Sequence, residues 1–66
     1  MPRKIRDLLF DLRSAGFIQV PGGKGSDRKF VHPMYRGFVL ISGPEGGDCQ
    51  HYQEKHVRRA LRQIEE

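Results

Sequence analysis

Residues 22–29, GGKGSDRK, combine the groups that proteins use to bind phosphate. Three glycines can adopt positive φ angles at little cost, so several backbone N–H groups can converge on one anion. The lysine among them brings a full positive charge, the serine brings a hydroxyl group, and an Arg-Lys pair follows. The segment is not a P-loop, because the G-x-x-x-x-G-K-[ST] spacing is absent. A plain hairpin linker is the alternative interpretation. The predicted phosphate-binding residues are Gly23, Lys24, Gly25, Ser26, Arg28 and Lys29.

The distribution of charge favours a polyanionic partner. The net charge is +4, and it is concentrated in the first half of the chain. Residues 1–36 contain eight basic and three acidic side chains, whereas residues 37–66 contain four and five. A basic half on a small chain suggests a polyanionic partner such as nucleic acid, and many housekeeping domains without such a partner are equally basic. The four cations of the second half recur at helical spacing, which suits a solvated helix face, contact with phosphates or contact with an acidic partner. They are Lys55, Arg58, Arg59 and Arg62.

Length and composition exclude several classes of protein. At 66 residues the chain holds one domain, residues 1–66, with no room for the deep cavity of a metabolic enzyme. Cys49 is the only cysteine, so no intrachain disulfide can form, and a zinc site is not expected. No apolar run approaches the roughly 20 residues that cross a bilayer, and the first residues do not resemble a signal peptide. We expect a cytoplasmic protein that needs no metal or cofactor and contacts no membrane.

Two amphipathic helices and three short strands must position the loop. Residues 3–16 and 51–66 each carry apolar side chains at i, i+3, i+4 and i+7, or close to it, which predicts a helix with one buried stripe. Residues 17–21, 28–32 and 37–42 are short segments that contain β-branched or aromatic residues and end at glycine or proline, which predicts strands. The expected buried positions are Ile5, Leu8, Leu9 and Leu12 in the first helix and Val57, Ala60, Leu61 and Ile64 in the second.

The order of these elements predicts an α+β fold. The three strands follow one another through short connections, so they should form an antiparallel sheet. Gly16 suits a left-handed residue that ends the first helix. If both helices cover one face of the sheet, the other face stays open to solvent or to a partner. This αβββα arrangement is that of a double-stranded-RNA-binding-domain-like (dsRBD-like) fold.

The loop and its surroundings resemble the HicA family of bacterial toxins. The matching pattern is G-G-K-G-S-x-R-K-F-x-H-P, which follows FIQV and precedes VLISG, GD and HYQEKHVRRAL, so that it covers nearly the whole chain. The resemblance implies the toxin component of a type II toxin–antitoxin system. Such toxins are mRNA interferases, endoribonucleases that bind and cleave RNA without a metal. The implied partners are mRNA and a HicB-type antitoxin protein that silences the toxin.

Asp27 departs from the pattern of that family. The residue after Gly-Ser is usually a histidine that carries out catalysis, so the resemblance places Asp27 in the catalytic position. A histidine near neutral pH can take a proton from a ribose 2′-OH and return it to the leaving oxygen. An aspartate in water is ionised at neutral pH and can only accept. We therefore expect the cleavage activity to be weakened or absent.

No other histidine is an obvious replacement. His32 is five residues further along an expected strand, roughly 16 Å from Asp27 at the rise of a strand. His56 borders the apolar stripe of the second helix and is expected to be structural. His51 is expected at the start of that helix, with Glu54 completing a cap.

Two functions other than an RNA-cleaving toxin fit the same residues. The first is a non-catalytic RNA-binding module of dsRBD-like fold, which the aspartate at position 27 favours. The second is a protein-interaction domain that uses the open sheet face and Phe10, an aromatic residue outside the buried stripe of the first helix.

Overall fold

The computed structural model describes residues 3–25 and 27–65 and confirms the expected order of helix, three strands and helix. Each strand is one to three residues shorter than the apolar run that predicts it. The elements are α1 (Ile5–Ser14), β1 (Ile18–Val20), β2 (Arg28–Val31), β3 (Val39–Ile41) and α2 (His51–Glu65). Within the described residues, no helix is long and apolar enough to cross a membrane.

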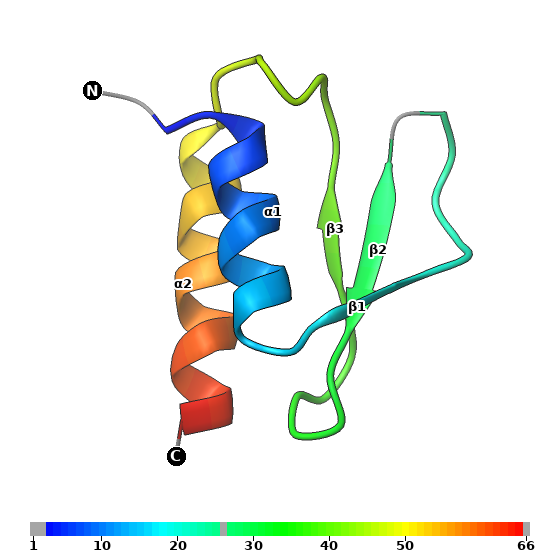
Figure 1. Cartoon of the computed structure of the whole chain (residues 1–66), viewed down its shortest axis with the longest axis vertical. Coiled ribbons are helices and arrows are strands. Elements are labelled where there is room, and N and C mark those ends of the chain that lie inside the picture. The colour runs from blue at the N-terminus through cyan, green and yellow to red at the C-terminus, as the bar shows by residue number, and fades with distance from the viewer. Residues whose placement is uncertain (1–2, 26, 66) are drawn as a thin grey trace.

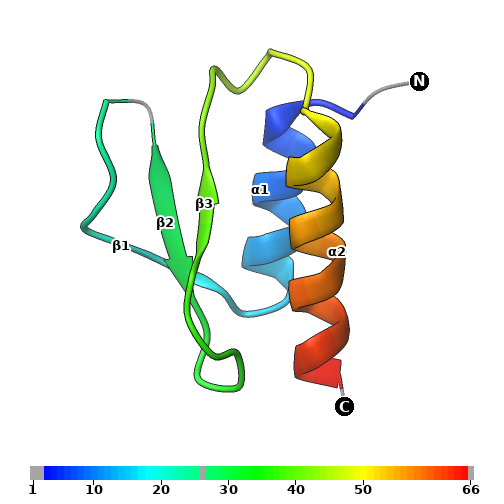
Figure 2. The same ribbon diagram turned by 180° about the vertical axis from the view of Figure 1, so that it is seen from behind.

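The three strands form one antiparallel sheet in the order β1-β2-β3. Both helices lie side by side on the same face of this sheet (Figure 1), and the view from behind shows the same two layers (Figure 2). The chain is therefore a small α+β protein. The loop between β1 and β2 projects from one end of the sheet, away from the C-terminal end of α2.

The core lies between the sheet and the helices, with Phe30 at its centre. Phe30 is fully buried in the middle strand and pairs with Val39 of β3. The expected stripe of α1 is buried, as are Val57 and Ala60 of α2, while Leu61 and Ile64 are partly buried against the core. The side chain of Phe10 is 69% exposed, as its position outside the stripe predicts.

The start of α1 is fixed by the loop between β3 and α2. The Ile5 and Arg6 amides donate to the Gly47 and Glu45 carbonyls at 2.9 and 3.0 Å, so two N–H groups that the helix cannot satisfy find partners there. At the other end of α1, Gly16 has a φ of +98°, which confirms the expected left-handed residue.

The start of α2 differs from the prediction. His51 is its first residue, as expected, but Glu54 does not complete the cap. Instead, the Gln50 amide donates to Gln53 Oε1 at 2.8 Å, and Gln53 Nε2 donates to the Ser42 carbonyl at 3.0 Å. Gln53 takes this role because its side chain is buried, and a buried amide must satisfy its donors and its acceptor.

Candidate functional site

The loop between β1 and β2 has the backbone conformation that its glycines predict. Gly22, Gly23 and Gly25 have φ angles of +143°, +81° and +59°. Residues other than glycine rarely adopt positive φ angles of this size. Residues 21–25 are all exposed, so the loop stands in solvent beyond the sheet. Ser26, also predicted to bind phosphate, lies outside the described residues.

The loop folds back on itself at Asp27. The Asp27 amide donates to the Lys24 carbonyl at 3.0 Å and closes a turn. A β-carbon built on Gly23 would lie 2.7 Å from the β-carbon of Asp27, closer than real β-carbons approach other atoms. Only a glycine at position 23 therefore lets the backbone lie against Asp27, whose side chain is half-buried. The structure thus holds residue 27 in a fixed place at the base of the exposed tip.

Lys24 is the cation at the tip of the loop. It is exposed and forms no ion pair with any carboxylate among the described residues. Next to it, the backbone runs through two glycines with positive φ. An unpaired lysine beside such a backbone can attract an anion and hold it with N–H groups.

Arg28 and Lys29 are the first residues of β2, so they lie beyond the tip that carries Lys24. Successive side chains of a strand point to opposite faces of the sheet, and these two side chains therefore diverge. Arg28 points to the helix side, where Nη1 donates to the Gly43 carbonyl at 3.2 Å and Nη2 lies 3.8 Å from Glu45 Oε2. Lys29 points to the open side, where its Nζ lies 4.4 Å from the centre of the Phe38 ring. Both cations flank the loop, yet each is already engaged with another part of the molecule.

The three histidines lie on other elements. His32 follows the end of β2 opposite to the loop, and its Nδ1 accepts a hydrogen bond from the Met34 amide at 3.0 Å. His56 Nε2 is 3.2 Å from the Tyr35 hydroxyl, which fits the structural role expected of it. His51 begins α2. The loop therefore positions a carboxylate at residue 27 and no imidazole beside it within these elements.

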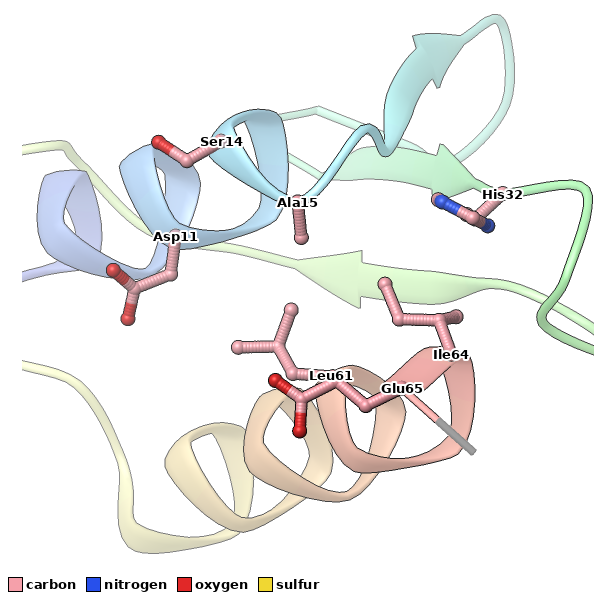
Figure 3. Close-up of a pocket in the computed structure, with 7 residues that line it drawn as sticks. All are labelled: Asp11, Ser14, Ala15, His32, Leu61, Ile64 and Glu65. Carbon is pink, nitrogen blue, oxygen red and sulfur yellow. The ribbon is translucent and has the colours of Figure 1, made fainter.

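A separate concavity lies between the C-terminal ends of the two helices (Figure 3), at the end of the molecule opposite to the loop between β1 and β2 (Figure 1). Its volume is about 440 Å³. Leu61 and Ile64 rise from α2 toward Ala15 and form its apolar floor. The sequence did not predict this concavity, because it depends on how the helix ends meet. The lining residues are Asp11, Ser14, Ala15, His32, Leu61, Ile64 and Glu65.

Of the carboxylates at this concavity, Asp11 is neutralised by Arg3 at 2.6 Å. Within residues 3–25 and 27–65, at this concavity or outside it, no group of three His, Cys, Asp or Glu side chains is placed to hold a metal ion. The chain has no match among protein-family models, among curated proteins or among solved structures.

Proposed function

We propose that the chain is an RNA-binding protein of the HicA toxin type with a dsRBD-like fold. In this proposal the loop at residues 22–27 binds a phosphate of the RNA, and residue 27 occupies the reacting position. The observation that carries it is the exposed, unpaired Lys24 on a glycine backbone that is folded against Asp27. The sequence resemblance supplies the toxin class, with mRNA as substrate, a HicB-type antitoxin as partner and a cytoplasmic location.

Phosphate binding by this loop follows from its charge and its backbone. Lys24 supplies a full positive charge on an exposed side chain, while N–H groups near Gly23 and Gly25 supply donors from the backbone. Arg28 and Lys29 contribute mainly through the positive potential that they create on the two sides of the loop. Ser26 is proposed as a hydroxyl donor from its position in the sequence.

The chemistry of Asp27 sets the limit of this proposal. A carboxylate is a much weaker base than an imidazole, so an aspartate at this position takes the 2′-OH proton less readily than a histidine does. The chain as it stands would therefore cleave RNA slowly or not at all. A non-catalytic RNA-binding module is the second candidate, and the carboxylate at position 27 is the observation that favours it. Cleavage assays on position-27 variants separate the two candidates.

RNA binding is tested by the fluorescence anisotropy of a labelled single-stranded RNA titrated at several salt concentrations. We expect Lys24→Ala to weaken binding of every RNA sequence and to reduce the slope of log affinity against log salt by about 1. Arg36→Ala, in the turn between β2 and β3, is the matched control, because it removes the same charge from an exposed position that is not a candidate phosphate contact. Equal losses in both variants would show that net charge, and not the loop, binds the RNA.

The antitoxin partner is tested by co-expression with the product of the neighbouring small gene. We expect a stable complex that no longer binds the labelled RNA. If the two products do not associate, the toxin–antitoxin part of the proposal is wrong, whereas the RNA-binding part can still stand on the anisotropy data.

A further inference from the structure

The face of the sheet that the helices leave open is largely apolar. Register places Ile18 opposite Val31 and Val20 opposite Lys29 on this face, and Leu40 pairs with Lys29 from the other side. The side chains of Ile18 and Leu40 are 62% and 38% exposed. Contiguous exposed apolar side chains on a small domain mark a surface that binds another molecule. We call this set the open face: Ile18, Val20, Lys29, Val31, Phe38 and Leu40.

Lys29 is the one charged side chain of the open face, and two neighbours contact it. Its Nζ lies 4.4 Å from the centre of the Phe38 ring, a cation–π contact. On the other side, a β-carbon built on Gly22 would lie 2.8 Å from Lys29 Cδ, so the glycine backbone lies against the lysine stem. No carboxylate among the described residues pairs with Lys29. The face thus presents a positioned, unneutralised cation within apolar surroundings.

These features decide between possible occupants. A nucleic acid strand needs several cations and free aromatic faces, whereas this surface offers one cation that already covers the Phe38 ring. A second copy of the chain would bring two Lys29 side chains toward each other as the faces meet, and like charges in an apolar interface are costly. A protein with apolar side chains around a single carboxylate satisfies both the apolar residues and Lys29.

We propose that the open face is a docking surface for a partner protein whose contact region is apolar and carries one Asp or Glu opposite Lys29. This carboxylate forms an ion pair with Lys29, while the surrounding apolar side chains cover Ile18, Phe38 and Leu40. The inference concerns a different surface from the tip of the RNA-binding loop and does not depend on RNA binding or cleavage.

The test is a selection of peptides from a phage-displayed library against the full chain. We expect enriched peptides with apolar residues on both sides of an Asp or Glu, and amide NMR shifts on peptide addition at residues 18–20, 29–31 and 38–40. Lys29→Glu should weaken their binding by at least about tenfold, as loss of a desolvated charge pair does. Replacing the acid of the peptide by lysine should restore binding to Lys29→Glu. Arg59→Glu is the matched control, since it makes the same charge change on exposed α2 and should leave binding unchanged.

Several results would overturn the inference. One is a selection that yields no acid-containing apolar peptide, and another is a peptide that binds the natural chain and Lys29→Glu equally well. Self-association in sedimentation velocity that Leu40→Ser abolishes would assign the face to a second copy. NMR shifts at Val31 and Leu40 on addition of RNA would assign it to nucleic acid. Leu40 is exposed and Lys29 is half-buried, so circular dichroism checks that Lys29→Glu and Leu40→Ser both fold.

Discussion

Gly23 and Asp27 lie so close together that a β-carbon on Gly23 would stand 2.7 Å from the β-carbon of Asp27. Gly23 also has a φ of +81°, so both space and backbone conformation require glycine there. The amide of Asp27 is held by the Lys24 carbonyl at the same time. Residue 27 is therefore positioned by the loop itself, and the exposed lysine is positioned with it. A change at Gly23 should disturb both.

The first prediction concerns Gly23→Ala, with Gly25→Ala as its control. Both positions have positive φ, so each alanine should cost about 1 kcal/mol or somewhat more in the free energy of unfolding. Only the alanine at position 23 also collides with Asp27, because nothing lies within 4 Å of a β-carbon at position 25. We expect Gly23→Ala to lower the free energy of unfolding, measured by urea denaturation, more than Gly25→Ala does. We also expect it to weaken RNA binding more. Equal effects of the two variants would show that the contact with Asp27 is unimportant.

The second prediction concerns Arg28, whose side chain connects β2 to the loop that fixes the start of α1. Arg28→Met removes the hydrogen bond to the Gly43 carbonyl and should lower the free energy of unfolding by about 1 kcal/mol. Because Glu45 and its neighbours accept from the first amides of α1, hydrogen exchange at Ile5 and Arg6 should become faster.

Arg36 provides the control for this prediction, because it is exposed in the turn between β2 and β3. Arg36→Met removes the same charge and should change stability by less than about 0.5 kcal/mol. If Arg28→Met leaves stability and exchange unchanged while RNA affinity falls, then Arg28 acts on the RNA and its contact with Gly43 is dispensable.

The third prediction concerns pH. Burial raises the pKa of the Cys49 thiol above its ordinary value of 9.0, and the negative charge of Glu54 adds to the effect. The unfolded chain therefore loses this proton at a lower pH than the folded chain. The resulting stability is complete below about pH 9 and is lost as the pH rises above it. We expect the free energy of unfolding in urea to fall more steeply as the pH rises above about 9 in the natural chain than in Cys49→Ala. Parallel pH profiles for the two chains would contradict this.

Much of the fold could be predicted because it follows from local patterns. The spacing of Leu8, Leu9 and Leu12 requires a helix with one buried stripe, and Gly16 marks its end. Three short apolar runs with close connections leave an antiparallel sheet as the simplest pairing. The cap of α2 was mispredicted, because Glu54 matches the local capping pattern, whereas the burial of Gln53 depends on tertiary packing against Ser42.

The candidate site was only partly predictable. The positive φ angles around Lys24 follow from the glycines alone. The directions of Arg28 and Lys29 follow from strand alternation, but their destinations depend on the β3–α2 loop and on Phe38, which are distant in sequence. The apolar character of the open face could have been predicted from the run FVLI at residues 38–41. A strand with one buried face needs apolar residues only at alternate positions, whereas this run is apolar at every position.

Cleavage of a labelled RNA in the presence of EDTA by Asp27→His tests the central claim most directly. If the loop holds residue 27 beside a bound phosphate, a histidine there should cleave RNA at least about 100-fold faster than the aspartate, the gain that general acid–base catalysis provides. Adding Lys24→Ala to Asp27→His should remove most of that gain, whereas adding Arg36→Ala should not. The contrary result is an Asp27→His protein that is folded and binds RNA but leaves it intact, and that result would reject an RNA-cleaving site at this loop.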